Sequence, residues 1–369
     1  MQEILNEFSN PNLSRKLLEK VKEAAEQFIE ENGRRPVFME VCGSHTMALA
    51  ETGVKKALRE HVNLISGPGC PVCVTDQKSI DAMIKLADGE NRIICTFGDM
   101  IRVPGTEFSL LEAKTEGKDI RIVYSPPDAV RIAEENPDKE VIFLGIGFET
   151  TIPVLGVALK EALDRDVKNF SMWMTTKLVE PILRTLLESN EVLIDGFLLP
   201  GHVSIILGKN NYQFLVDEYN IPGVISGFES VELLGGIYKL IRQLLEGRVE
   251  IENDYSSVVT DEGNIAAQKL IGTYFEPVDE AWRGIGVIPK SGMDIRKEYG
   301  KLNAKNRFNI TVGEPRKTKC RCGEVIRGVV SPEECPLFGK ACTPLKPIGP
   351  CMVSAEGTCS AHYQYMRED

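Results

Sequence analysis

Six of the ten cysteines of this 369-residue chain lie within its last fifty residues. They belong to a tail that begins near residue 314, is rich in proline, glycine and cysteine, and lacks any long periodic segment. Such an irregular region rarely buries enough apolar surface to stay folded alone, so a metal or disulfides are the expected staple. The spacing is C-x-C-x12-C-x6-C-x8-C-x7-C, formed by Cys320, Cys322, Cys335, Cys342, Cys351 and Cys359.

Two kinds of metal site fit a cysteine-rich tail, and the spacing separates them only in part. Structural zinc sites usually pair their ligands as C-x2–4-C knuckles, and no such pair occurs in the tail. Iron–sulfur clusters also take four thiolates but follow looser spacing. Six cysteines are too many for one cluster, so two are left as a redox pair or as bystanders. Spacing alone does not select the four ligands, and a zinc-stapled tail remains open.

The rest of the composition narrows the class of protein. The N-terminus lacks a basic segment followed by an apolar stretch, so we expect no signal peptide. No run approaches the roughly 18 apolar residues of a membrane span, and the net charge of −11 argues against a nucleic-acid surface. We therefore expect a cytoplasmic protein that binds neither membranes nor nucleic acid. In a reducing cytosol, cysteines usually serve metal or redox chemistry.

The alternation of apolar runs with helical patterns predicts an α/β fold with parallel sheets. The expected strands form two sets, 37–41, 62–65, 93–97 and 120–124, then 141–144, 170–174, 196–199 and 224–226. We read them as two similar α/β units. The expected domains are an N-terminal helix in 1–34 that packs on the third domain, α/β units at 35–130 and 131–228, and a mainly helical or irregular domain at 229–369 that holds the cysteine-rich tail.

Polar residues in glycine-bearing loops follow several of the expected strands. Ligands of open α/β sheets bind beyond the carboxyl ends of the strands. We therefore hypothesise that two facing units gather these side chains around one cleft. The residues concerned are Cys42, His45, Cys70, Cys73, Asp99, Glu149 and His202.

Each of these residues also has an ordinary structural interpretation. Cys70-Pro-Val-Cys73 is typical of a dithiol that cycles with a disulfide, or of half a zinc site. Cys42 beside His45 suits a soft-metal site or an activated nucleophile, or is a small buried residue in a turn. The two histidines, His45 and His202, are cleft donors or loop residues bonded to backbone.

The two acidic residues of the group are also open to two interpretations. Asp99 and Glu149 could bind cations or transfer protons, or could cap helices. A further cysteine, Cys95, lies inside an apolar run and is expected in the core. Neither a dinucleotide fingerprint nor a Walker motif occurs, which argues against an NAD enzyme and an ATPase.

Several motifs in order along the chain strongly resemble the HypD family of [NiFe]-hydrogenase maturation factors. The resemblance extends from the first motif through the tail to Tyr365 and covers nearly the whole chain. The motifs are Cys42-Gly-Ser-His45-Thr, Gly67-Pro-Gly-Cys70-Pro-Val-Cys73, Thr96-Phe-Gly-Asp99-Met, Gly147-Phe-Glu149-Thr-Thr and Pro200-Gly-His202-Val-Ser.

This resemblance implies a three-domain fold in which the third domain carries a [4Fe-4S] cluster. The family's ligand pattern, C-x14-C-x6-C-x16-C, selects Cys320, Cys335, Cys342 and Cys359. Cys322 and Cys351 are then left as a possible disulfide or redox pair.

The resemblance further implies a scaffold on which the Fe(CN)2CO unit is assembled with the small chaperone HypC, with cyanide delivered by the carrier HypE. Low-spin iron with these ligands prefers soft thiolates. Cys42, with a cysteine of the partner, is therefore the candidate iron anchor, and His45 is its neighbour.

Redox chemistry connects the two groups of cysteines. Releasing cyanide from a carrier thiocyanate needs two electrons, which a dithiol at Cys70 and Cys73 can supply, whereas a [4Fe-4S] cluster normally passes one. We predict that the pair relays electrons between cluster and cleft, in a maturation scaffold rather than an independently acting enzyme. Two alternatives are a stand-alone iron–sulfur dithiol oxidoreductase and a zinc-stapled α/β ligand-binding protein.

Overall fold

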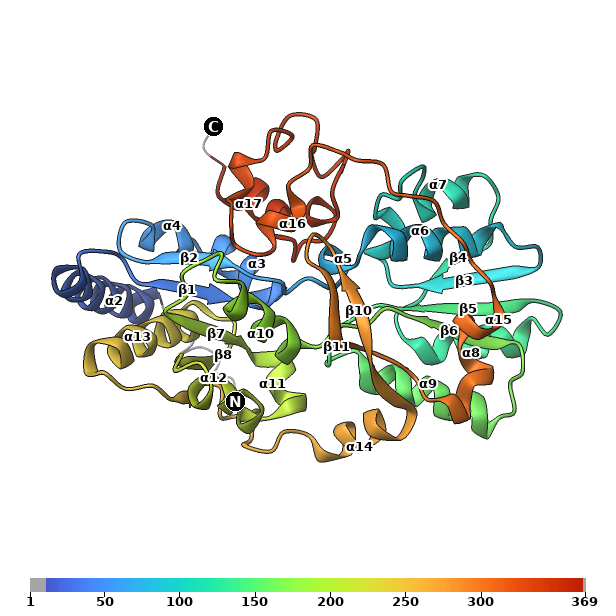
Figure 1. The fold of residues 1–369 in the computed structure, drawn as a ribbon, viewed down its shortest axis with the longest axis horizontal. Helices are drawn as coiled ribbons and strands as arrows, with labels where there is room; N and C mark the ends of the chain where they lie inside the picture. The colour runs from blue at the N-terminus through green and yellow to red at the C-terminus, as the bar shows by residue number, and fades with distance from the viewer. Residues whose placement is uncertain (1–10, 368–369) are drawn as a thin grey trace.

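Two separate parallel sheets dominate the computed structural model, which describes residues 11–367 (Figure 1). One sheet has five strands in the order β2-β1-β7-β8-β9, and the other has four in the order β4-β3-β5-β6. This confirms the prediction of an α/β fold with two parallel sheets. The strands are β1 (Val37–Glu40), β2 (Asn63–Ser66), β3 (Arg92–Thr96), β4 (Ile120–Ile122), β5 (Glu140–Gly145), β6 (Phe170–Met174), β7 (Gly196–Pro200), β8 (Gly223–Ser226) and β9 (Ile251–Asn253).

Helices return the chain between the parallel strands, as such connections require. The first unit, built on the five-stranded sheet, contains α3 (Gly43–Glu51), α4 (Val54–Leu58), α10 (Val179–Ser189), α11 (Gly201–Leu207), α12 (Gln213–Asp217) and α13 (Ser230–Glu246). The second unit, built on the four-stranded sheet, contains α6 (Gln77–Lys85), α7 (Leu110–Thr115), α8 (Pro126–Glu135) and α9 (Ile152–Asp164). Short 3-10 helices occupy several connections, η1 (Leu86–Asp88), η2 (Met100–Arg102), η3 (Lys209–Tyr212) and η4 (Lys297–Leu302).

The two sheets do not follow the predicted division of the chain at residue 130. β3 and β4 pair with β5 and β6, whereas β7 pairs with β1 through the register Met39↔Phe197. The second unit is thus an insertion between β2 and β7 of the first. The third domain also begins later than residue 229, since α13 and β9 complete the first unit. Apolar runs identify strands but carry no information on which distant strand each one joins.

The predicted N-terminal helix exists as α2 (Pro11–Asn32), and residues 1–10 of the expected segment lie outside the described residues. Its buried stripe of Val21, Ala24, Ala25 and Phe28 packs in one core with α13 and the outer face of β1. The helix thus packs on a segment of the expected 229–369 domain, as predicted, but that segment, α13, belongs to the first unit. The apolar stripe required a partner face, and α13 provides it.

Successive residues of each strand enter different cores, as the two-residue period of a strand dictates. Phe38 lies in the core under α2 and α13, whereas Met39 lies in a larger core shared by both units. In β3, Ile94 joins the shared core and Cys95 faces the α8 and α9 side, fully buried. The core prediction for Cys95 is confirmed. The continuous shared core holds the two units in one arrangement.

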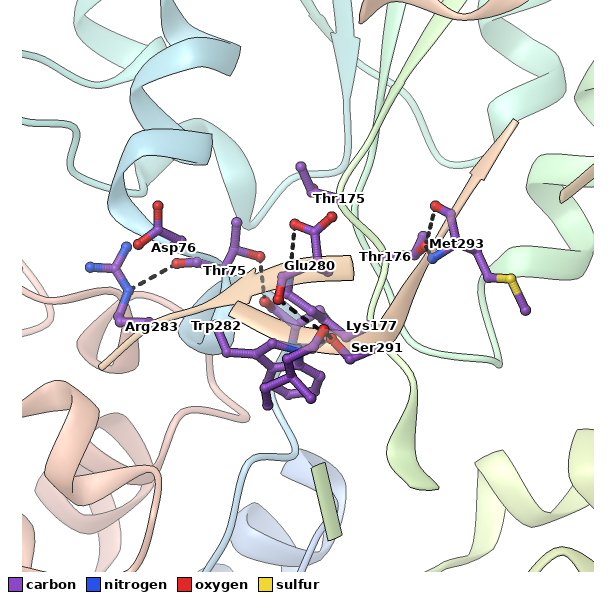
Figure 2. A network of polar contacts seen from close by, with 12 residues as sticks. Thr75, Asp76, Thr175, Thr176, Lys177, Glu280, Trp282, Arg283, Ser291 and Met293 are labelled. Atoms are coloured by element: carbon purple, nitrogen blue, oxygen red, sulfur yellow. Dashed lines mark hydrogen bonds and ion pairs between the residues drawn. The ribbon is translucent and has the colours of Figure 1, made fainter. Parts of the chain in front are cut away.

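An antiparallel hairpin lies across both places where the chain crosses between the units. It consists of β10 (Phe275–Trp282) and β11 (Gly286–Ile295). The backbone N–H of Arg283 donates to Val74 O at the outward crossing (2.8 Å), and the N–H of Leu178 donates to Ser291 O at the return crossing (2.9 Å). Figure 2 shows the hairpin between the two crossing segments. The hairpin therefore fixes the relative position of the units.

A buried ion pair lies at the centre of this junction (Figure 2). Lys177 Nζ lies 2.9 Å from Glu280 Oε1, and the lysine side chain has no exposed surface. The ammonium also lies 5.7 Å from the ring centroid of Trp282, whose indole N–H donates to Ser291 Oγ (2.8 Å). Burial lowers the pKa of Lys177, and the charge of Glu280 opposes this effect. Each charge of the pair thus depends on the other.

The cysteine-rich tail forms a compact region over both units, which we call the C-terminal region (residues 314–367) (Figure 1). It follows α14 (Ile265–Tyr274), the hairpin and α15 (Ala304–Arg307), and its longest element is the eight-residue α17. Its elements are α16 (Cys322–Val325), η5 (Pro332–Glu334), η6 (Pro350–Met352) and α17 (Thr358–Tyr365). The irregular character predicted for the tail is confirmed. No helix capable of spanning a membrane occurs between residues 11 and 367.

Candidate functional site

A cavity of about 160 Å³ lies where the two units and the C-terminal region meet. The first unit contributes Cys42 and His202, the second contributes Phe148 and Thr150, and the C-terminal region contributes Glu356. Cys42 and His202 come together because β1 and β7 are adjacent and parallel, so their carboxyl ends emerge side by side. Of the seven side chains expected around one cleft, these two line it directly. We call this cavity the cleft.

Cys42 stands at the N-terminus of α3, directly after β1. Burial raises the pKa of its thiol to about 12, although the first backbone amides of α3, at Ser44 and His45, oppose this. The thiol is therefore neutral at physiological pH. A soft metal cation would displace its proton, since the thiolate is the form that binds metals.

The two histidines of the cleft region have different environments. The ring of His45 is fully buried, and its Nε2 lies 3.0 Å from Gly227 O and 3.2 Å from Ser226 O, so this nitrogen donates to backbone. Burial lowers the pKa of His45 to about 4, and its Nδ1 has no partner. His202 lines the cleft, and both rings contact Phe228, His202 by stacking at 4.2 Å. His45 thus supports the cleft from behind, whereas His202 faces it.

The two acidic residues expected at the cleft take different positions. Glu149 is buried, its Oε1 accepts the backbone N–H of Val179 (2.8 Å), and its Oε2 has no partner. Burial raises the pKa of Glu149 to about 7. Asp99 is exposed and accepts a hydrogen bond from the Ser354 hydroxyl (2.6 Å). Asp99 therefore holds the C-terminal region on the second unit and does not line the cleft.

Cys70 and Cys73 form a disulfide on a short helix, α5 (Pro71–Val74), with both residues buried. The neighbours of Cys70, Gly69 and Pro71, line the cleft. The next helix along the chain is α6, with Asp76 as its N-cap. On its other side α5 contacts η6, which carries Cys351. The disulfide therefore lies between the cleft and the C-terminal cysteines.

All six cysteines of the C-terminal region line a single small cavity, which we call the cysteine cavity. Four of them, Cys322, Cys335, Cys342 and Cys351, are buried, and Cys320 and Cys359 are partly buried. Gly349 also lines the cavity, and a β-carbon there would lie 2.7 Å from Cys320 Sγ. A side chain at this position would push on the sulfur, which explains the glycine.

Two of the six cysteines are set apart by their close contact. The Sγ atoms of Cys322 and Cys351 lie 2.9 Å apart, and both residues are buried. The neighbouring thiols of Cys320 and Cys351 lower the pKa of Cys322, and the positive charge of Arg283 adds to this effect. A thiol of lowered pKa beside a second thiol is the arrangement that thiol–disulfide exchange uses.

The donor set of the cysteine cavity fits an iron–sulfur cluster. Within residues 11–367, no three His, Cys, Asp or Glu side chains converge as a single ion would require. The four thiolates of a [4Fe-4S] cluster bind four different irons and therefore stand farther apart than the ligands of one ion. The thiols that line the cysteine cavity are the soft donors that such a cluster takes.

Two carboxyl groups near Cys42 escaped the sequence interpretation. Glu356 lines the cleft and accepts a hydrogen bond from Ser44 Oγ (2.6 Å), although 312 residues separate them in sequence. Glu40 is buried in β1 and accepts hydrogen bonds from Thr46 Oγ1. Burial raises the pKa of Glu40 to about 7. Glu40 could have been noticed in the sequence as a glutamate inside an apolar strand. No residue near Glu356 in the sequence indicates that it reaches the cleft.

Comparisons with known proteins agree with this arrangement of motifs. The HypD family model, described as "Hydrogenase formation hypA family", matches residues 12–366. The chain is 42% identical to hydrogenase maturation factor HypD of Escherichia coli K12 over 99% of its length and 98% of that protein. It is also 42% identical to HypD of Cupriavidus necator, over 98% of its length and 97% of that protein. The chain therefore belongs to the HypD family of hydrogenase maturation factors.

Proposed function

We propose that this chain is a scaffold that binds the Fe(CN)2CO unit of [NiFe]-hydrogenase at Cys42 during its assembly. The observation that carries the proposal is a continuous path of cysteines from the C-terminal region to the cleft. Cys322 and Cys351 line the cysteine cavity, η6 contacts the helix of the Cys70–Cys73 disulfide, and the residues flanking Cys70 line the cleft beside Cys42.

Cys42 is the residue that offers the cargo iron a thiolate. Its thiol lies at the end of a strand, at the wall of a cavity, and is neutral until a metal displaces the proton. His202, Phe148 and Thr150 shape the rest of the wall. The cleft leaves room for a second thiolate, which we assign to a HypC-like chaperone. A HypE-like carrier would deliver cyanide as a thiocyanate.

The proposed redox step balances with the residues present. In the reduced form, Cys70 and Cys73 supply two electrons and two protons and become a disulfide. The carrier's S–CN bond takes up both electrons and breaks; one proton completes the carrier thiol, and the other leaves with the cyanide as HCN or passes to solvent when cyanide binds as the anion. The Cys322–Cys351 dithiol then restores Cys70 and Cys73 by thiol–disulfide exchange.

The four remaining cysteines of the cavity are the proposed cluster ligands. We assign a [4Fe-4S] cluster to Cys320, Cys335, Cys342 and Cys359, which line the cysteine cavity together with the Cys322–Cys351 pair. When bound, the cluster would supply one electron at a time, so two successive electron transfers are needed to reduce one disulfide.

Replacing Cys42 tests the division of labour between cleft and cysteine cavity. The Cys42→Ala variant, purified anaerobically with a HypC-like partner, should lose the infrared bands of bound cyanide and carbon monoxide. It should keep its iron–sulfur signal, because Cys42 does not line the cysteine cavity. Cys95→Ala is the control, since Cys95 is also a buried free cysteine but lies in the core on the α8 and α9 side, away from the cleft. Loss of the cluster from the Cys42 variant would contradict the proposal.

A further inference from the structure

A second, larger cavity of about 610 Å³ opens beside the cysteine cavity. It is bounded by the C-terminal region, by residues 104–106 of the second unit and by Arg283 at the turn of the β10–β11 hairpin. Cys320, Cys322 and Gly349 line both cavities. Anything bound in the larger cavity would therefore lie next to Cys320, a proposed cluster ligand, and Cys322 of the proposed redox pair. We call it the basic pocket, because its charged lining is entirely cationic.

Three cationic side chains of the basic pocket lie close together in sequence. Arg316, Lys317 and Lys319 line it, are exposed, and make no ion pair with any residue between 11 and 367. Among residues 11–367, no acidic side chain lines the pocket. The nearby Glu314 is already paired with Lys78 (2.7 Å). A cluster of free cations stands out in a chain of net charge −11.

Arg283 adds a fourth positive charge at the inner wall. Its Nε donates to Thr75 O (3.0 Å) and its Nη1 donates to Gln77 Oε1 (2.9 Å), which fixes the guanidinium. Its Nη2 is buried without a partner, and its side chain lines the same pocket as Cys320 and Cys322. The positive potential of the basic pocket thus extends to the sulfur atoms.

We propose that the basic pocket is the docking site of an acidic protein that carries one electron at a time. This inference rests on the proposed function and names the partner that supplies its electrons. Opposite charges on two proteins raise the rate of encounter and fix orientation. Arg316, Lys317 and Lys319 lie exposed at the rim, where the surface of another protein can reach them. They do not enclose a space for a small anion. Two successive encounters would deliver the two electrons that, with two protons from solvent, reduce one disulfide.

Neutralising the rim tests the inference. The variant Arg316→Gln/Lys317→Gln/Lys319→Gln removes three charges whose side chains make no hydrogen bond or ion pair with any residue between 11 and 367. A reduced acidic plant-type ferredoxin, mixed with the iron–sulfur-loaded protein in a stopped-flow instrument, reports the rate of electron transfer. At low ionic strength the rate constant should fall about tenfold or more, and the difference should shrink in high salt. Binding of oxidised ferredoxin, measured by calorimetry, should weaken in parallel.

Two controls separate this inference from the proposed function. The variant Arg15→Gln/Lys16→Gln/Lys20→Gln removes three exposed charges from α2, and it should react like the wild type. Dithionite, a small reductant, should reduce all three proteins equally. Equal ferredoxin rates for the rim variant and the wild type, or an equal loss in the α2 variant, would overturn the docking site. Absence of any cluster signal after dithionite would instead contradict the proposed function.

Discussion

Removing the ammonium of Lys177 should strongly destabilise the junction between the two units. In the variant Lys177→Met, the apolar stem of the side chain is retained, but Glu280 loses the cation 2.9 Å away. Glu280 is 8% exposed, so water cannot replace the lost partner. Breaking a buried pair in this way typically costs about 3–5 kcal/mol.

The free energy of protonating Glu280 sets an upper limit on this cost. A buried carboxylate that has lost its cation becomes neutral when it takes up a proton. For an ordinary glutamate pKa of about 4.3, protonation costs about 3.7 kcal/mol at pH 7 and about 1 kcal/mol at pH 5. We therefore expect the free energy of unfolding to fall by about 3–4 kcal/mol at pH 7 and by only about 1 kcal/mol at pH 5.

Urea unfolding at both pH values measures this difference. A double variant, Lys177→Met/Glu280→Met, serves as the control, because it removes both charges and should recover to within about 1 kcal/mol of the wild type. A deficit for Lys177→Met that does not change with pH would refute the reasoning. The same would follow if the double variant were as unstable as the single one.

Three further substitutions test the cleft, the buried carboxyl of Glu149 and the cysteine cavity. Gly69→Ala places a β-carbon against the backbone of Cys42; it should displace the start of α3 and abolish the infrared bands of the bound iron unit, while the acid-labile sulfide content of the cluster stays unchanged. Glu149→Gln removes a carboxyl whose folded pKa is raised to about 7 by burial. Below pH 4.5 this carboxyl is neutral in both the folded and the unfolded state. As the pH rises toward 7, the unfolded state ionises while the folded state stays neutral, so the wild type loses stability. The Gln variant should therefore gain about 2 kcal/mol relative to the wild type between pH 5 and 7 in urea unfolding. Gly349→Ala pushes on Cys320 Sγ and should lower the sulfide content of purified protein, whereas Gly272→Ala, which meets open space, should not.

The fold was predictable in its parts but not in its connections. Apolar runs located β1 to β8, and the stripe of Val21 and Phe28 located α2, but β9 and the β10–β11 hairpin were missed, because the region after residue 229 was expected to be helical or irregular. The pairing of β1 with β7 was not predictable, since it depends on packing between segments about 160 residues apart. For the same reason, α13 was placed in the wrong domain.

The site shows a similar division between local and distant information. Cys42 and His202 both follow strand ends and line the cleft, as predicted, but they meet because β1 and β7 pair within one sheet and not because two separate units face each other. Asp99 obeys the same rule, but its strand lies in the other sheet and its carboxylate is taken by Ser354. Glu356 reaches the cleft only because the C-terminal region folds back over α3, and no local pattern describes that contact.

Metal and sulfide analysis of anaerobically purified protein tests the central claim most directly. The account predicts about four irons and four acid-labile sulfides per chain, with an electron paramagnetic resonance signal that appears on reduction, as expected of a [4Fe-4S] cluster. Zinc without sulfide, obtained under careful exclusion of oxygen, would contradict it. The cysteine cavity would then be a structural staple, and the path of cysteines to Cys42 would have no source of electrons.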